Sequence, residues 1–194
     1  MPRRPRHQEP GEHYHVVSRG NNKHAIFDQE LRDLFLRNLV RVSVAYEWRV
    51  LAYALMSNHY HLVIRIGEAG LSTGMFQLNH GFARASNTRF DRINHCFGRR
   101  FWSAHLDTND YLLASIRYGM WNPARVAICG DPAGSTWTSF RGSVGLDDPH
   151  PVLAISDLYA LFHPRPADAR LVLYDYVQAG HGRCQAPWDG PTST

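Results

Sequence analysis

Two histidines one residue apart begin an apolar run in "LMSNHYHLVIRI", residues 55–66. Alternate side chains of a β-strand lie on the same face, so His59 and His61 would project together, about 6–7 Å apart. Tyr60 and the alternate apolar residues after it would face the opposite way, into a core. Imidazoles at this spacing can bind one metal ion. The pattern therefore predicts a half-buried strand with a two-histidine metal site on its non-core face.

The spacing alone is a weak signal. With twelve histidines in the chain, about 0.7 His-x-His pairs are expected by chance, and a second pair is present at His13 and His15. A strand over 12–20 could lie beside strand 59–66, which would make His15 a neighbour of the site and not a ligand. Two histidines do not complete a zinc cage, which takes four N or S ligands. A harder third ligand would favour Mg²⁺ or Mn²⁺, with substrate phosphate and water completing the shell.

The stretch "YLLASIRYGMWNP", residues 111–123, offers such a ligand together with a nucleophile. Tyr118 and Asn122 are four residues apart and would share an exposed helical face. Ser115 and Tyr111 belong to the same face, and the opposite, buried face would carry Leu113, Ile116 and Met120. Two other interpretations remain open: Tyr118 as a packing residue, and Asn122 as the end of the helix, because Pro123 disfavours helical geometry just before it.

Basic residues suggest a nucleic-acid partner. The net charge of +4 is by itself a weak indication. In "HCFGRRFW" arginines alternate with aromatic residues, and guanidinium groups that bind phosphates beside rings that stack on bases suit single-stranded nucleic acid. A solvated basic face and aromatic core residues are the alternatives. The predicted DNA-binding residues are Arg3, Arg4, Arg6, Arg84, Arg99, Arg100, Phe101 and Trp102.

Periodicity predicts an α+β fold, in which an antiparallel sheet has helices packed on one face. The expected strands are 12–20, 48–56, 59–66 and a short one within 100–107, and the expected helices are 29–46, 71–92, 109–122, 155–162 and 167–179. The short link at 57–58 predicts a hairpin. The expected domains are a basic arm (1–10), a catalytic domain (11–145), a helical extension (146–183) and a flexible tail (184–194).

The composition, with 44% hydrophobic and 20% charged residues, is that of a soluble globular protein. No apolar run is long enough for a membrane span, and the basic N-terminus lacks the apolar stretch of a secretory signal. Cys96, Cys129 and Cys184 form no CxxC pair. We therefore expect a reduced, cytoplasmic location and no membrane partner.

Several stretches together resemble the single-tyrosine transposases of the HUH nuclease superfamily, in particular the REP-associated tyrosine transposases. They are "YHVVSRGNNKHAIF", "YALMSNHYHLVI", "FGRRFWSAHLDTNDYLLASIRYGMWNPAR", "STWTSF" and "SDLYALF…YVQAG", in the family's order over most of residues 10–180. The resemblance implies a ferredoxin-like (RRM-like) fold. It implies that His59, His61 and Asn122 bind a divalent metal, Mg²⁺ or Mn²⁺, and that Tyr118 is the catalytic nucleophile.

The activity implied is metal-dependent cleavage and strand transfer of single-stranded DNA with hairpin or palindromic repeats, through a 5′-phosphotyrosine. The oligomeric state implied is a monomer or homodimer. The chain departs from the family at Gly119, directly after Tyr118, and in the looser stretch "NTRFDRINH". Gly119 favours an alternative, a hairpin-binding protein with a weak or inactive site. A cupin or a two-histidine phosphoesterase fits poorly, because the former needs a barrel and the latter needs His-x-Ser/Thr twice.

Overall fold

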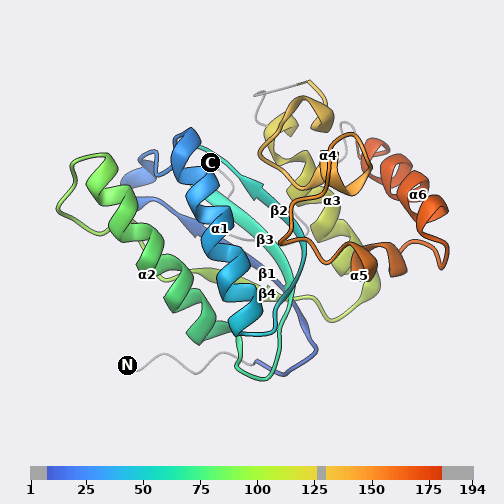
Figure 1. Cartoon of the computed structure of the whole chain (residues 1–194), viewed down its shortest axis with the longest axis horizontal. Helices are drawn as coiled ribbons and strands as arrows, with labels where there is room; N and C mark the ends of the chain where they lie inside the picture. The colour runs from blue at the N-terminus through green and yellow to red at the C-terminus, as the bar shows by residue number, and fades with distance from the viewer. Residues whose placement is uncertain (1–7, 126–129, 181–194) are drawn as a thin grey trace.

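A four-stranded antiparallel sheet lies at the centre of the computed structural model, which describes residues 8–125 and 130–180 (Figure 1). The strand order is β2-β3-β1-β4. In chain order the elements are β1 (His13–Arg19), the 3₁₀ turn η1 (Asn21–Lys23), α1 (Gln29–Ala45), β2 (Arg49–Leu55), β3 (His59–Arg65), α2 (Leu71–Arg89), β4 (Trp102–His105), α3 (Asn109–Arg125), the 3₁₀ turn η2 (Pro132–Gly134), α4 (Phe140–Ser143), α5 (Ile155–Ala160) and α6 (Pro166–Gln178).

The β2–β3 hairpin closes as its short link predicts. The amide N–H of Met56 donates to the carbonyl of His59 at 2.9 Å, and the two strands pair antiparallel up to Arg49 and Arg65. Strand β1 then pairs with β3 on its other edge, with Val17 opposite His61. The two histidine-bearing strands are therefore neighbours, as expected from their sequences.

Helices α1 and α2 cover one face of the sheet and lie side by side in Figure 1. Helix α1 begins at an N-cap, because Asp28 Oδ1 accepts a hydrogen bond from the Leu31 amide at 2.9 Å. The residues of β3 that face these helices are apolar or aromatic: Tyr60, Leu62, Ile64 and Ile66. They join one hydrophobic core with the inner faces of both helices, which confirms the predicted inward face of this strand.

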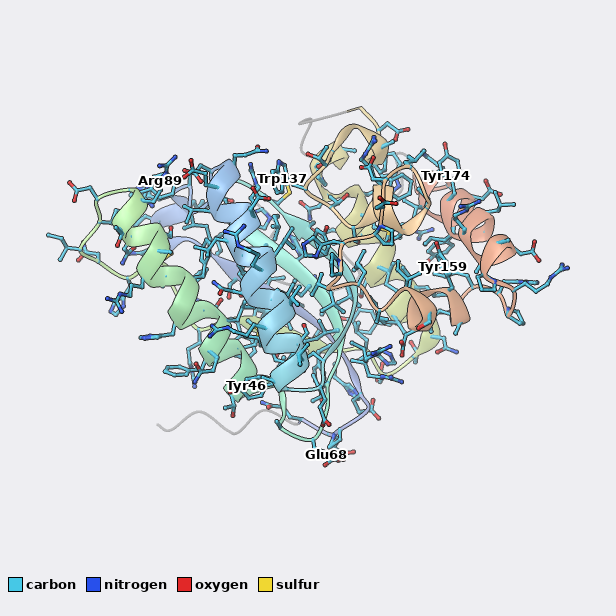
Figure 2. The ribbon with its side chains drawn as sticks, in the orientation of Figure 1. Tyr46, Glu68, Arg89, Trp137, Tyr159 and Tyr174 are labelled. Carbon is cyan, nitrogen blue, oxygen red and sulfur yellow. The ribbon has the colours of Figure 1, made fainter. Side chains whose placement is uncertain are left out.

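The opposite face of the sheet is covered as well, over β2 and β3, by α3. Helix α3 in turn packs against α6, so α3 is enclosed between the sheet and the C-terminal helices. On this side of the molecule Figure 2 labels Tyr159 on α5 and Tyr174 on α6, well away from Arg89 of α2. A second hydrophobic core forms there around Leu112, Ile116 and Met120.

The predicted α+β, antiparallel-sheet fold is confirmed, with two differences. Helix α3 continues to Arg125, whereas the sequence predicted an end at Asn122, because proline restricts the residue before it without excluding a helix held by packing on both sides. The histidine face of the sheet, expected to be open, lies under α3. None of the helices within the described ranges has both the length and the apolar character to cross a membrane.

Candidate functional site

The histidine face of the sheet brings together side chains from two strands. His61 lies opposite Val17 and His59 opposite Arg19, while His15 lies opposite Val63. Because neighbouring strands keep the same alternation, all of these side chains share one face. The rings of His59 and His61 have centroids 5.0 Å apart, and His15 stacks on His61 at 5.2 Å with an interplanar angle of 7°. The predicted pair is thus a cluster of three histidines.

Hydrogen bonds give the histidines a consistent set of tautomers. Asn122 Nδ2 lies 3.0 Å from His61 Nε2, and His61 Nδ1 lies 3.0 Å from His15 Nε2. If the amide donates to Nε2, then Nδ1 of His61 carries the proton and donates to His15. His59 Nδ1 lies 2.6 Å from Asn58 Oδ1, a carbonyl oxygen that accepts its proton. In this assignment the Nε2 atoms of His59 and His61 both carry a lone pair.

Burial favours the uncharged forms of His15 and His59. It lowers the pKa of His15 to about 3, and burial together with the charge of Arg19 lowers the pKa of His59 to about 4. A neutral imidazole is the form that binds a cation. The environment of His59 therefore favours its metal-binding form at neutral pH.

Helix α3 supplies the two remaining groups. Its first turn is capped by Thr108, whose hydroxyl oxygen accepts from the amide of Tyr111 at 3.2 Å. Tyr118 then packs edge-on against His61, with ring centroids 5.5 Å apart, and Asn122 follows one turn later against the same imidazole. The (i, i+4) spacing on one helix face thus directs the phenol and the carboxamide to one histidine.

The predicted exposure of this helix face was wrong. Tyr118 and Asn122 are each 2% exposed and Ser115 is fully buried, because the face that carries them rests on the sheet. Ile116 and Met120 are buried as predicted, but Leu112 is buried in place of Leu113. Both changes follow from the position of α3, which has protein on two sides.

Gly119 and Pro123 create a weak point in α3 next to these groups. Proline has no N–H, so Pro123 cannot donate to the carbonyl four residues earlier, which belongs to Gly119. Glycine is itself less favourable in a helix than alanine by roughly 1 kcal/mol. The turn between Tyr118 and Asn122 is therefore the least stable turn of α3 on intrinsic grounds.

The donor atoms suit an open site better than a closed cage of protein ligands. An ion there would be hexacoordinate and would also bind water and substrate oxygens. Within residues 8–125 and 130–180, no three His, Cys, Asp or Glu side chains cluster as metal ligands. Instead, His61 contacts both the His59 imidazole and the Asn122 carboxamide. The Asn122 amide, whose nitrogen lies 3.0 Å from His61 Nε2, would present its oxygen to an ion if it rotated.

The predicted DNA-binding residues come from different segments of the fold. Arg84 on α2 is exposed, as are Arg99 and Arg100 before β4. Trp102 is half-buried beside the site, with its ring 5.6 Å from His15. Phe101 is a correction: it belongs to the hydrophobic core under α1 and α2, and so it has no ring face available for a base. Arg3, Arg4 and Arg6 lie outside the described residues.

Arg19 is a site residue that was not predicted. It lies opposite His59 in the β1–β3 register, and its charge contributes to the low pKa of that histidine. Its Nε is buried and has no hydrogen-bond partner within the described part of the chain. In the sequence, Arg19 follows His15 by four residues. Because this separation is even, the two side chains lie on the same face of β1, the face that carries the histidines.

A known protein family matches more than half of the chain. The family model described as "Transposase IS200 like" matches residues 10–116, more than half of the 194-residue chain. The chain belongs to the IS200-like transposase family. Its activity class is therefore DNA transposition, which requires DNA binding and cleavage. The match includes both predicted histidine ligands and ends two residues before Tyr118.

A solved structure supports the fold of this IS200-like transposase. A REP-associated tyrosine transposase bound to a REP hairpin is similar, with a TM-score of 0.64 and 16% sequence identity over 81% of this chain and 93% of that chain. A protein from Deinococcus radiodurans assigned as a transposase has a TM-score of 0.42 and 13% identity, over 57% of this chain and 88% of that one. No curated protein gives a significant match to the sequence.

Proposed function

We propose that this transposase cleaves and rejoins single-stranded DNA beside a hairpin, with Tyr118 as the nucleophile and a divalent ion bound by His59, His61 and Asn122. The observation that carries the proposal is the contact of one imidazole with both groups of α3. His61 touches the Asn122 amide at 3.0 Å and the Tyr118 ring at a centroid distance of 5.5 Å. A nucleophile and a ligand set next to each other are what a phosphoryl transfer requires.

The chemistry assigned to Tyr118 balances without a further reactant. The phenol oxygen attacks phosphorus, the bond from phosphorus to the 3′-oxygen breaks, and the phenol proton ends on that oxygen as a 3′-hydroxyl. The product is a 5′-phosphotyrosine, and an incoming 3′-hydroxyl can reverse the reaction and release Tyr118. Energy is retained in the phosphoester, so rejoining needs no ATP. One tyrosine handles one strand at a time, which suits a single-stranded substrate.

Arg19, His15 and the proposed metal ligands would have distinct parts in binding the phosphate. Arg19, half-buried next to His59, is placed to bind a phosphate oxygen through its outer nitrogens. His15 accepts from His61 and fixes the direction of that imidazole. A bound Mg²⁺ or Mn²⁺ would supply Lewis-acid stabilisation of the phosphate charge at the two histidines and Asn122.

Attack requires that Tyr118 become accessible, because it is 2% exposed with α3 against the sheet. The weak turn at Gly119 and Pro123 adjoins the tyrosine, and movement there would expose the phenol at a low free-energy cost. We infer that substrate binding moves this part of α3.

The proposed substrate contains a hairpin. Support comes from the similar structure, which is a REP-associated tyrosine transposase bound to a REP hairpin, and from the motifs that resemble that branch. Trp102, half-buried beside His15, offers an aromatic ring edge near the proposed cleavage position. The exposed Arg99 and Arg100 immediately before it would neutralise neighbouring phosphates.

A denaturing gel tests the proposal. Purified protein, hairpin-bearing single-stranded DNA labelled on the side that would remain joined to the protein, and Mg²⁺ should give a covalent adduct that EDTA prevents. Tyr118→Phe should abolish the adduct, and Arg19→Gln should reduce it more than tenfold. The matched control is Tyr111→Phe on the same helix, which should leave the adduct unchanged. An adduct that persists in Tyr118→Phe would overturn the assignment.

A second candidate function is hairpin binding without cleavage, which the burial of Tyr118 and the presence of Gly119 favour. The same gel separates the two functions when it is combined with a binding measurement. A protein that retards hairpin DNA in a native gel but forms no adduct under any divalent ion would be a binder.

A further inference from the structure

The outer face of α2 carries a line of three side chains that the proposed site does not use. Phe76, His80 and Arg84 are spaced four residues apart, so they lie one above another along the helix over roughly 12 Å. All three are exposed. We call this line the α2 ridge. It lies on the side of the sheet opposite α3, since α2 belongs to the first hydrophobic core and α3 to the second.

The first two members of the α2 ridge form an open aromatic stack. The rings of Phe76 and His80 have centroids 5.5 Å apart and are within 17° of parallel. Phe76 is 62% exposed, although phenylalanine is usually buried. A stacked pair with most of one ring in water is a surface on which a further flat ring can stack.

Two arginines lie near one end of this stack, Arg84 one turn after His80 and Arg41 beside Gly81, and acidic residues are absent from α2. Residues 71–89 contain no Asp or Glu. Arg41 of α1 reaches across to α2, where its guanidinium lies 4.0 Å from the position of a Cβ at Gly81. Arg37 lies one turn before Arg41, and both are exposed. In the part of the chain that the structure describes, Arg37, Arg41 and Arg84 make no ion pair, whereas Arg89 is paired with Asp28.

We propose that the α2 ridge, with Arg37 and Arg41, binds unpaired nucleotides of single-stranded DNA at a distance from the cleavage site. Aromatic faces stack bases and free guanidinium groups neutralise phosphates, which is the combination that single-strand binding requires. An acidic peptide would pair with the arginines but would leave the stacked rings without a partner. The proposal shares its ligand class with the proposed function but does not require Tyr118 to react.

Fluorescence anisotropy tests this surface without cleavage. Full-length Tyr118→Phe protein is titrated with labelled oligo-dT, which has no hairpin, in EDTA. Adding Phe76→Ala should weaken binding about tenfold or more, and Phe76→Tyr should preserve it. Changing Arg37, Arg41 and Arg84 to Gln together should reduce the slope of log K against log salt by about 2, at 0.7 for each phosphate contact.

The controls use α6, on the other side of the molecule. Leu171 is also 62% exposed, and Arg170 is exposed beside it, so Leu171→Ala and Arg170→Gln should leave affinity and salt slope unchanged. Phe76→Leu separates stacking from general hydrophobic contact, because it keeps the apolar surface and removes the ring. Binding equal to that of the parent in Phe76→Leu or Phe76→Ala would overturn the proposal. So would a change from dimer to monomer in Phe76→Ala on size exclusion, which would assign the α2 ridge to a second copy of the chain.

Discussion

Both faces of the sheet are buried against a hydrophobic core, but the face under α3 also encloses a group of histidine side chains in contact with one another and with an asparagine. Beneath α1 and α2, β3 contributes Tyr60, Leu62, Ile64 and Ile66, and the packing is hydrophobic apart from a few hydroxyl and amide contacts. Beneath α3, the same strand contributes His59 and His61 beside Val63, and His61 contacts His15 and Asn122 in the interior.

Within β3, therefore, the apolar side chains mainly provide stability, and the histidines are the candidates for chemistry. Apolar burial is the main source of folding free energy, whereas buried polar groups are at best weakly stabilising even when they are hydrogen-bonded. A set of polar groups that is enclosed and connected, such as the one under α3, is therefore explained better by what it binds than by what it stabilises. The following predictions test that division, from the largest expected effect to the smallest.

The largest effect on stability is expected in the apolar layer. Phe82→Ala removes a fully buried ring that packs on Phe27, Phe35 and Phe97, and it should lower the free energy of unfolding by about 3–5 kcal/mol. Phe76→Ala, on the exposed side of the same helix, should change it by less than about 0.5 kcal/mol. Urea unfolding measures both. Equal losses would mean that α2 does not bury the face described.

An intermediate effect is expected for two asparagines that are matched across the sheet. Asn79 accepts from the Tyr60 hydroxyl and donates to Ser18, and Asn122 contacts His61. Each change to Leu should cost about 1–3 kcal/mol of stability, because it leaves a buried polar group without its partner.

Adduct formation, measured at a temperature at which both variants remain folded, should distinguish these two changes. Asn79→Leu should retain the adduct and Asn122→Leu should lose it. If both variants cleave DNA at the same rate as the parent, Asn122 has no part in the reaction.

The smallest effect is expected at Gly119. A Cβ added there has no other atom within 4 Å, so Gly119→Ala introduces no clash and should raise the free energy of unfolding by roughly 0.5–1 kcal/mol. Thermal or urea unfolding would detect the change. A decrease in stability would show that the backbone of α3 at this residue is not that of a regular helix.

Local patterns were sufficient to predict most of the fold. The three long strands and α1, with its Asp28 cap, follow from alternation, helical periodicity and one side-chain acceptor within a few residues. The contacts of His61 with His59, Tyr118 and Asn122 agree with the expected grouping, which for Tyr118 and Asn122 rested on helical spacing and on the family resemblance. Their catalytic and ligand roles stay predictions, as do the domain boundaries and the oligomeric state.

The parts that could not be predicted depend on contacts between distant segments. Whether the histidine face is open is decided by α3, about 60 residues away in sequence, and the burial of α3 is decided by α6. Phe101 was assigned to DNA because it lies among arginines, but β4 directs it into the core, while its neighbour Trp102 faces the histidines. Arg19 was missed although its spacing from His15 places it on the histidine face, because a lone arginine at a strand end is not by itself typical of a binding site.

The interruption at Gly119 and Pro123 has a consequence for control of the reaction. The phenol lies on one side of the interrupted turn and the carboxamide at its far end, so a bend there would swing the tyrosine while Asn122 stays against its imidazole. An enzyme that forms a covalent bond to DNA risks leaving breaks wherever its nucleophile meets a strand. If Tyr118 is the nucleophile, its burial on a helix that bends at Gly119 and Pro123 would prevent it from reacting with DNA until the substrate strand is bound.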